Sequence, residues 1–247
     1  MLAGIALGLA LQGRVAETGA LFEEAKAANP AYRQSILVEL EATVSWIAGD
    51  FAAAGALVQE AVAWQPTATP RRRAIGMTMG ALAAIERNDE VEAERLVERA
   101  KVAYDGRDWS YFLQMTLAAE AVLAWHAGRA ADCVAALRPA AARLMEMSAR
   151  PWAAFALFDL AEAAAEAGDV ASAAAAAADL HAVAEFVALP LYRGLAAAAS
   201  AWAGLAAGDC EQAVACARQA TKLLSETDCA AHLGRAHYVL GRALPAE

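Results

Sequence analysis

The sequence lacks the residue patterns that mark several common classes of protein. Aromatic residues make up only 7% of it, and its four cysteines show no Cys-x-x-Cys spacing of the kind that binds zinc or exchanges disulfides. Lys and Arg number 20 against 29 Asp and Glu, so the formal net charge is −9, whereas nucleic-acid binders normally need a basic stripe. We therefore expect buried, reduced thiols in a cytoplasmic protein, no cofactor or metal, and no direct nucleic-acid binding.

The sequence also shows no pattern typical of a targeting or membrane-spanning segment. Residues 1–11 are apolar, but no basic region precedes them, so they do not resemble a signal peptide. The longest uncharged run, 194–208, is shorter than the ~20 residues that a membrane-spanning helix needs. The sequence therefore predicts no membrane partner.

Motifs that would indicate an enzyme are missing too. The sequence contains no phosphate-binding Gly-x-x-x-x-Gly-Lys-Ser/Thr loop, no His-Glu-x-x-His and no Gly-x-Ser-x-Gly. Of its four histidines only His232 and His237 are close in sequence, and a spacing of five does not place both on one helix face. We expect the histidines to be groove or surface residues and the chain not to be an enzyme.

What the sequence does have is a turn signal that recurs at a nearly constant interval. A Gly or Asn, in most copies followed by Asp, falls at positions 13, 49, 88, 128, 168 and 208, so successive steps are 36, 39, 40, 40 and 40 residues. A constant period in this range is typical of helical-repeat solenoids. Gly ends one helix and Asp caps the next, which predicts a helix on each side of every turn.

Small and apolar residues recur at fixed places relative to these turns. Positions eleven residues before each turn, and nine and twelve residues after it, hold small or apolar residues in every copy. Small side chains at fixed places let paired helix backbones approach closely. Seven residues before the turn, every copy has alanine: Ala6, Ala42, Ala81, Ala121, Ala161 and Ala201.

The segments between the turns have the apolar spacing of helices. In residues 31–48 and 51–64, one predicted helix pair, apolar side chains recur every three or four residues. Most prolines fit the expected helix boundaries, namely Pro30, Pro66, Pro70, Pro151 and Pro190. Pro139 lies inside a second helix, and we expect it to kink that helix or delay its start. No stretch shows strand alternation, so the predicted fold is all-α.

Counted with the turn glycine as position fifteen, the repeat resembles the tetratricopeptide repeat. Positions eight, twenty and twenty-seven are small, and Pro30 and Pro66 occupy position thirty-two. The usual repeat has 34 residues; the longer copies here resemble the superhelical domains of MalT-like, large ATP-binding LuxR-type bacterial transcriptional regulators. This resemblance implies a right-handed superhelix, an α-solenoid of about six antiparallel helix-turn-helix repeats plus a terminal helix, spanning 1–247 as one domain.

Both ends of the sequence fall inside a repeat. Met1 is only twelve residues before the first turn, and Gly241 occupies the small-residue position of a repeat whose turn would fall at position 248. Solenoids usually carry polar capping helices at their ends, and neither end here is polar. We expect a segment of a longer protein; the alternative is a complete chain that forms a homodimer through its exposed end helices.

The resemblance also implies a binding surface, because first helices line the concave face of tetratricopeptide arrays. The inward positions are those thirteen, ten, six, three and two residues before each turn. A groove of aromatic and acidic side chains suits a basic or amphipathic peptide, or an apolar small molecule. The alternative is that these side chains only pack against neighbouring first helices. The residues implied are Ile36, Glu39, Trp46, Glu86, Met115, Trp125, His126, Phe155, Phe158, Glu162, Glu166 and Trp202.

The function that this pattern favours is binding without catalysis. We expect a superhelical domain that binds a protein or peptide partner, or a small-molecule inducer, as the sensor or scaffold region of a LuxR-type transcriptional regulator. The alternative is a standalone tetratricopeptide-type adaptor that assembles protein complexes. An enzyme accessory subunit is a more distant third hypothesis.

Overall fold

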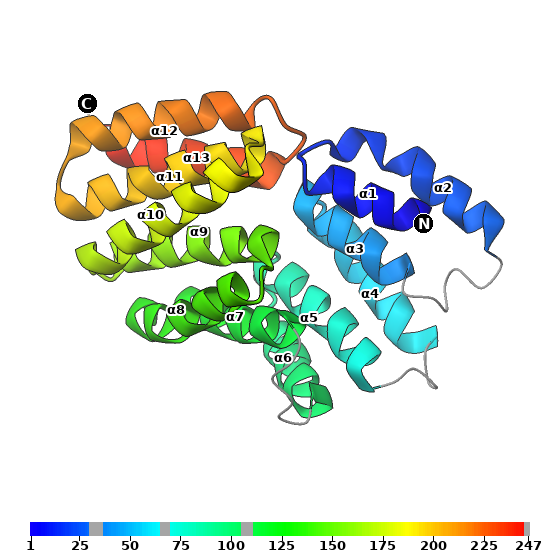
Figure 1. The fold of residues 1–247 in the computed structure, drawn as a ribbon. Coiled ribbons are helices and arrows are strands. Elements are labelled where there is room, and N and C mark those ends of the chain that lie inside the picture. Colours follow the sequence, from blue (N-terminus) through cyan, green and yellow to red (C-terminus); the bar gives the residue numbers. More distant parts are fainter. Residues whose placement is uncertain (30–36, 65–69, 105–110, 245–247) are drawn as a thin grey trace. The chain divides into compact units, whose positions relative to one another are not determined.

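The computed structural model describes residues 1–29, 37–64, 70–104 and 111–244 (Figure 1). All regular elements in these residues are helical, and the described chain contains no strand, which confirms the predicted all-α class. Ile36, Pro30 and Pro66 lie outside the described residues. The helices fall into two compact units, an N-terminal unit of Met1–Leu123 and a C-terminal unit of Ala124–Glu247, and each is described by itself.

The helices of each unit follow one another along the chain with short connections. The N-terminal unit contains α1 (Leu2–Ala10), the 3-10 helix η1 (Val15–Glu17), α2 (Gly19–Ala28), α3 (Leu37–Ala48), α4 (Phe51–Trp64), α5 (Pro70–Glu86), α6 (Glu90–Tyr104) and most of α7 (Tyr111–His126). The C-terminal unit contains the end of α7, α8 (Ala130–Glu146), α9 (Arg150–Glu166), α10 (Val170–Val187), α11 (Pro190–Ala207), α12 (Cys210–Leu224) and α13 (Ala230–Ala243).

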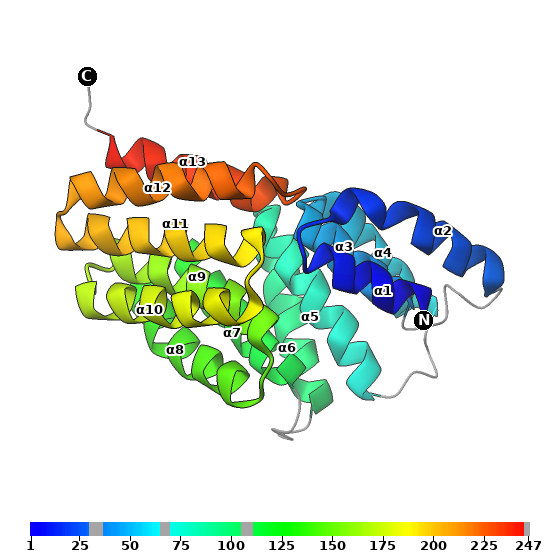
Figure 2. The same ribbon diagram turned by 45° about the horizontal axis from the view of Figure 1, so that its top comes forward.

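Consecutive helices pack against one another in both units. In the C-terminal unit each helix from α8 to α13 contacts the next, and α11 also contacts α9 and α13 (Figure 2). In the N-terminal unit α3 contacts α4, α4 contacts α5 and α5 contacts α6, while α3 also touches α1 and α5. Each helix in these pairs therefore packs against its chain neighbour, and first helices such as α3 and α11 also pack against the helices two places away.

The predicted turns lie where the helices end. Their glycines, and Asn88, adopt the left-handed conformation, with φ between 57° and 89°. Glycine enters this region without a steric penalty, and asparagine enters it more readily than most residues, so both are suited to end a helix. The positive-φ turn residues are Gly13, Gly49, Asn88, Gly128, Gly168 and Gly208.

Aspartate caps the helix that follows four of these turns. The carboxylates of Asp50, Asp89, Asp169 and Asp209 accept a hydrogen bond from the backbone N–H three residues later, at 2.9, 3.2, 3.0 and 3.0 Å. Such a bond satisfies one of the N–H groups left unpaired at a helix start. The first turn differs, because Arg14 follows Gly13 and a 3-10 helix intervenes before α2 begins.

The recurring small residues are buried where helices meet. The alanines seven residues before each turn are at most 1% exposed, and the residues nine and twelve after each turn are buried in every copy. Two glycines show how little room remains: a Cβ on Gly80 would lie 2.8 Å from Cγ1 of Val58, and one on Gly194 would lie 2.6 Å from Cγ of Leu224. Larger side chains at these places would force the helices apart.

Three of the four described prolines agree with the predicted boundaries, and the fourth does not. Pro70 and Pro190 begin α5 and α11, and Pro151 lies in the first turn of α9. The prediction that Pro139 delays the start of its helix is wrong, because α8 begins at Ala130 and continues past it to Glu146. Pro139 lies on the exposed side, where water can reach the carbonyl that loses its partner, while neighbouring Leu137 and Ala140 are buried.

The four cysteines are free thiols with different environments. Cys133 and Cys229 are buried, and burial raises the pKa of the Cys133 thiol to about 12. Cys216 is partly exposed and Cys210 is exposed. The expectation of buried thiols therefore holds for two cysteines and is wrong for Cys210, which begins α12 on its solvent side.

One described helix, α10, is long and apolar enough to cross a membrane by length and composition. It is not the run 194–208 that the sequence singled out. Buried core helices share these properties, and α10 packs against α9 and α11 through an alanine-rich side. Its exposed side carries Asp179, His181 and Glu185.

Candidate binding face

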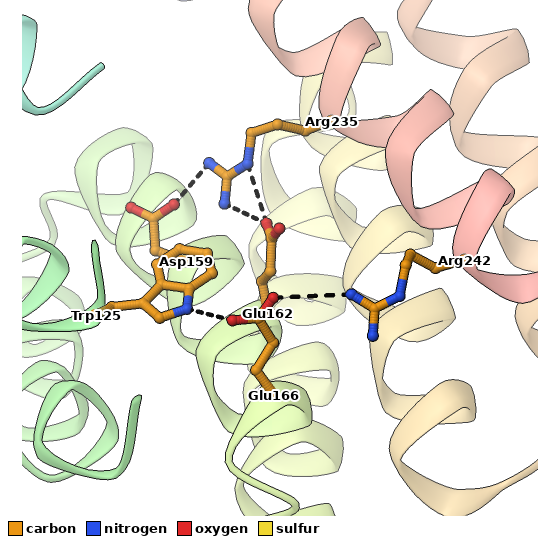
Figure 3. Close-up of polar contacts among 6 residues, drawn as sticks. All are labelled: Trp125, Asp159, Glu162, Glu166, Arg235 and Arg242. Carbon is orange, nitrogen blue, oxygen red and sulfur yellow. Dashed lines mark hydrogen bonds and ion pairs between the residues drawn. The ribbon is translucent and has the colours of Figure 1, made fainter. Parts of the chain in front are cut away.

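A row of acidic and aromatic side chains follows one side of α9. Phe155, Phe158, Asp159, Glu162 and Glu166 are separated by one, three or four residues, a spacing that places them along one side of a helix. Trp202 of α11 and Trp125 near the end of α7 extend the row. We call these seven residues the acidic–aromatic face; Figure 3 shows its polar part.

The terminal helix α13 places an arginine on this face. The Arg235 guanidinium donates to Asp159 Oδ1 at 2.7 Å and to Glu162 Oε2 from Nη2 and Nε at 2.6 and 3.1 Å (Figure 3). Its central carbon lies 4.1 Å from the centre of the Phe158 ring. Two charge-assisted contacts and a cation–π contact therefore hold one half-buried side chain.

His232 occupies the same side of α13, three residues before Arg235. Its ring stacks on Phe155, with centroids 5.2 Å apart and planes 14° apart, and meets the edge of Phe158 at 6.1 Å. Burial, followed by the nearby charge of Arg235, lowers the pKa of His232 to about 3. The imidazole is therefore neutral near pH 7 and packs as an aromatic ring.

Further along α13, Tyr238 and Arg242 lie against Trp202. The Trp202 and Tyr238 ring centroids are 5.9 Å apart, and the Arg242 guanidinium lies 5.8 Å from each ring. Arg242 also donates to Tyr238 Oη at 3.0 Å and approaches Glu166 Oε1 at 4.0 Å (Figure 3). These contacts are looser than those of Arg235, because the Arg242 side chain is half exposed.

Glu166 contacts side chains from two other helices. Its other carboxylate oxygen, Oε2, accepts a hydrogen bond of 2.6 Å from the indole Nε1 of Trp125 (Figure 3). Trp125 is half-buried and meets the ring of His126 edge-on at 5.9 Å. One glutamate therefore contacts both an arginine of α13 and a tryptophan of α7.

Among the acidic residues of the face, Glu162 has the environment that least favours the charged form of the carboxyl group. Burial raises its pKa, and the Arg235 charge and hydrogen bonds only partly oppose this shift. Asp159 and Glu166, two further negative charges nearby, raise it as well. The carboxylate at the centre of the face therefore depends on a cation from α13.

The contacts show that α13 runs parallel to α9 in matched register. His232 meets Phe155 near the start of α9, Arg235 meets Asp159 and Glu162, and Arg242 meets Glu166 at its end. At about 1.5 Å per helical residue, these contacts span about 15 Å on α13 and about 16 Å on α9. The helix α13 therefore covers most of the length of the acidic–aromatic face.

The structure distributes the residues implied for binding unevenly. In the C-terminal unit Phe155, Phe158, Glu162 and Trp202 are buried, Trp125 is half-buried, and Glu166 and His126 are exposed. In the N-terminal unit Glu39, Trp46 and Met115 are buried and Glu86 is half-buried. Of the C-terminal set, Phe155, Phe158, Glu162, Glu166 and Trp202 contact α13, and Trp125 joins them through Glu166.

The glutamate of the N-terminal unit shows the alternative, packing role. Glu39 is only 2% exposed and lies against α5, where a Cβ on Gly76 would be 3.7 Å from its Oε1. A carboxylate in such a place is part of the helix–helix contact and not a surface that a ligand reaches. The prediction that these side chains pack between first helices therefore describes Glu39 well.

Sequence reasoning missed the α13 residues, although a signal for them was present. Gly241 placed a seventh turn at position 248, and the inward positions thirteen, ten and six residues before it are Arg235, Tyr238 and Arg242. The structure places these three side chains against α9 and α11. Asp159 was missed because it lies nine residues before its turn, outside the expected inward set.

Catalytic geometry is weak in the part of the chain that the structure describes. No group of three or more His, Cys, Asp or Glu in it is arranged to hold a metal ion. His181 Nε2 lies 2.9 Å from Ser200 Oγ, but both residues are inside helices. The backbone N–H groups around Ser200 bond within α11, so they cannot form an oxyanion hole.

Comparison with known proteins adds no relative. No protein-family model matches the chain, and no curated protein matches its sequence. Function is therefore inferred from the residues and their geometry.

Proposed function

We propose that this chain is a non-enzymatic binding domain, a right-handed superhelix of about six helix-turn-helix repeats whose first helices bind a protein or peptide segment. The buried alanines at one repeat position and the Asp caps after the turns support a repeating architecture. Elongated helical arrays of this kind use extended surfaces for binding.

The observation that carries the proposal is the contact between Arg235 and the acidic–aromatic face. Two carboxylates and a phenylalanine ring of α9 hold one guanidinium, at 2.6 to 3.1 Å from the carboxylates and 4.1 Å from the ring centre. Arginine is favoured for such planar, partly buried recognition. The face therefore has the chemistry to bind a basic, amphipathic helix laid along α9.

We further propose that the chain is the sensor or scaffold region of a cytoplasmic LuxR-type regulator, as the 40-residue period and tetratricopeptide-like positions suggest. A segment bound on the face would favour one arrangement of the helices and so bias the attached domains. The alternative, a standalone adaptor, is supported by the fact that the acidic–aromatic face lies within the C-terminal unit and needs no further domain.

The coding sequence on either side of residues 1 and 247 separates these two proposals. The regulator proposal expects a phosphate-binding loop upstream and a helix-turn-helix domain downstream. A stop codon directly after Glu247, with no ATPase upstream, would contradict it and favour the adaptor.

Binding itself is tested by site-specific photo-crosslinking in the cells that make the protein. A photoreactive amino acid replaces Glu166 on the face or, as the control, Arg218 on the exposed side of α12; both residues are exposed. We expect a discrete adduct at Glu166 only, in which mass spectrometry identifies a basic helical segment. Equal adducts at both positions, or none at Glu166, would contradict a protein-binding role; a small-molecule inducer would then have to be sought by thermal-shift screening.

A further inference from the structure

The helix that covers the acidic–aromatic face is intrinsically weak. α13 contains Gly234 and Gly241, both exposed, and a Cβ at either position would meet nothing within 4 Å. Packing therefore does not require these glycines. Each glycine lowers the helix-forming equilibrium about fivefold relative to alanine.

The apolar anchors of α13 are also small. Its buried apolar side chains are Ala236, Val239 and Ala243, with the ring of His232 beside them. Small side chains bury little apolar surface, so they contribute little to docking compared with Leu or Phe. α13 therefore packs on α12 and α11 through small side chains, while its polar contacts reach across to α9.

The charges on the two helices are not balanced. α9 presents three carboxyl groups, Asp159, Glu162 and Glu166, whereas α13 supplies two guanidinium groups, Arg235 and Arg242. The Arg242–Glu166 distance of 4.0 Å is at the outer limit for an ion pair. A helix with a closer second arginine, or with a third positive charge, would match the face better than α13 does.

We propose that α13 is an exchangeable occupant of the acidic–aromatic face, and that the external ligand is a helix of a partner protein with the same chemistry. Such a helix carries two arginines seven residues apart, as Arg235 and Arg242 are, and an imidazole or aromatic ring three residues before the first, as His232 is. The inference rests on the proposed function and adds to it the ligand class and a competitor built into the chain.

Competition predicts how substitutions in α13 change ligand affinity. An apparent dissociation constant equals the intrinsic constant divided by the fraction of molecules whose site is free, so it rises as docking of α13 becomes more favourable. Gly234→Ala with Gly241→Ala touches no contact on α9 but stabilises the docked helix, so it should weaken an external ligand about 25-fold. Arg235→Gln removes the main anchor of α13, so it should strengthen the same ligand at least tenfold.

The experiment measures fluorescence anisotropy of a labelled peptide with the sequence of residues 229–244, in which Ser replaces Cys229. The peptide is titrated with the wild-type chain, the double Gly→Ala variant and Arg235→Gln. A second peptide with Glu at both arginine positions is the control. We expect Arg235→Gln to bind the peptide most tightly, the wild type less tightly and the double Gly→Ala variant most weakly. The control peptide should show no saturable binding.

Each other outcome has a definite meaning. Equal affinity for all three chains would show that α13 does not compete, and the exchange proposal would be wrong while a binding face remained. Circular dichroism would show whether Arg235→Gln folds. If it does not, the double Gly→Ala variant provides the test, and a peptide affinity equal to that of the wild type would contradict the proposal. No binding to any folded chain, together with a discrete crosslink at Glu166, would overturn the ligand class but keep the proposed function.

The alternative external occupant of the acidic–aromatic face is α13 from a second copy of this chain. Light scattering of the wild-type chain, whose α13 keeps Arg235, would detect a concentration-dependent dimer if α13 exchanged between two copies. Such a dimer, with no peptide binding, would contradict the partner helix.

Discussion

The two units each bury a glutamate of a first helix, at different positions of the repeat and in different surroundings. In the N-terminal unit, Glu39 lies ten residues before its turn and is buried against α5. In the C-terminal unit, Glu162 lies six residues before its turn and is equally buried, but a guanidinium from α13 holds it. Both are carboxyl groups inside a helical unit, and the second is part of a row of charges that α13 matches.

Polar contacts between first helices show the same contrast. In the N-terminal unit Thr78 and Thr116, both fully buried, share a hydrogen bond of 2.6 Å between their hydroxyl groups. Neutral hydroxyls cost little to bury and attract few outside ligands. The ion pairs of Arg235 are charged and only partly buried, so a competing cation can replace them. The comparison teaches that burial alone does not separate a packing contact from the proposed binding face; the charge of the contacts also distinguishes them.

The largest expected effect compares two tryptophans of the face. Trp202 is 1% exposed, so Trp202→Ala should lower the free energy of unfolding by about 3 to 5 kcal/mol. Trp125 is only half-buried, so Trp125→Ala should cost about 1 kcal/mol. Urea unfolding followed by far-ultraviolet circular dichroism measures both. Equal losses would mean that Trp125 is core in the same sense as Trp202.

The next effect concerns the ion pairs of Arg235. Arg235→Met leaves Glu162 buried without its cation, and we expect a loss of about 3 kcal/mol at pH 8. The matched control, Arg95→Met, removes an exposed ion pair with Glu92 and should cost less than about 0.5 kcal/mol.

The same variant should respond to pH in a defined direction. Burial already raises the pKa of Glu162, and removing Arg235 raises it further. A carboxyl group with a raised folded-state pKa stabilises the fold below its unfolded pKa and loses that contribution as pH rises. Arg235→Met should therefore lose less stability at pH 5 than at pH 8. An equal loss at both values would show that Glu162 does not need the cation.

A third prediction concerns acid stability through His232. Its pKa falls from 6.5 to about 3 in the folded state, so its contribution is present above pH 6.5 and is lost as pH falls. Between pH 7 and pH 5 this loss is about 2 kcal/mol. Arg235 on α13 and the carboxyl groups of Asp159 and Glu162 on α9 are the charged groups nearby, and Glu162 acts in the opposite direction.

His232→Phe keeps the stacked ring but cannot take up a proton. We expect its stability to change less than that of the wild type between pH 7 and pH 5, as urea unfolding at each pH would show. His237→Phe, at an exposed position of the same helix, is the control and should behave like the wild type. Identical pH profiles for His232→Phe and the wild type would contradict a neutral, buried His232.

The smallest expected effect compares the helix caps of the two units. Asp209→Ala removes a cap bond of 3.0 Å from α12 and should cost about 1 kcal/mol. Asp89→Ala removes a bond of 3.2 Å from α6, and we expect a somewhat smaller loss. Thermal unfolding of both variants tests whether the repeating turns are equally strong in the two units; a larger loss for Asp89→Ala would reverse the order.

The local part of the fold could be predicted from the sequence. Gly168 and Asp169 end one helix and cap the next because these properties belong to the two residues themselves. Ala161 and its counterparts were identified by repetition, since a close helix contact excludes larger side chains in every copy. Pro139 shows the limit of such rules, because burial of neighbouring residues overrides the propensity of one proline.

The binding face could be predicted only in part. Phe158 and Glu162 were expected on the concave side, but their partner Arg235 is more than seventy residues away in the sequence from each. No local pattern states which helix covers which, because that depends on how far the helices of the unit curl. Whether Glu39 or Glu162 faces a ligand also depends on how far the helices curl, so the sequence alone predicted both as inward-facing residues.

The buried thiol at the start of α13 makes it possible to measure the rate at which that helix detaches. Cys229 is fully buried and burial raises its pKa to about 11, so a thiol reagent can modify it only after α13 lifts. Exposed Cys210 reacts at once, and Cys133 inside α8 must await a larger opening of the unit. With Cys216 replaced by Ser, a single time course of thiol modification therefore reports three rates, for the surface, the terminal helix and the core.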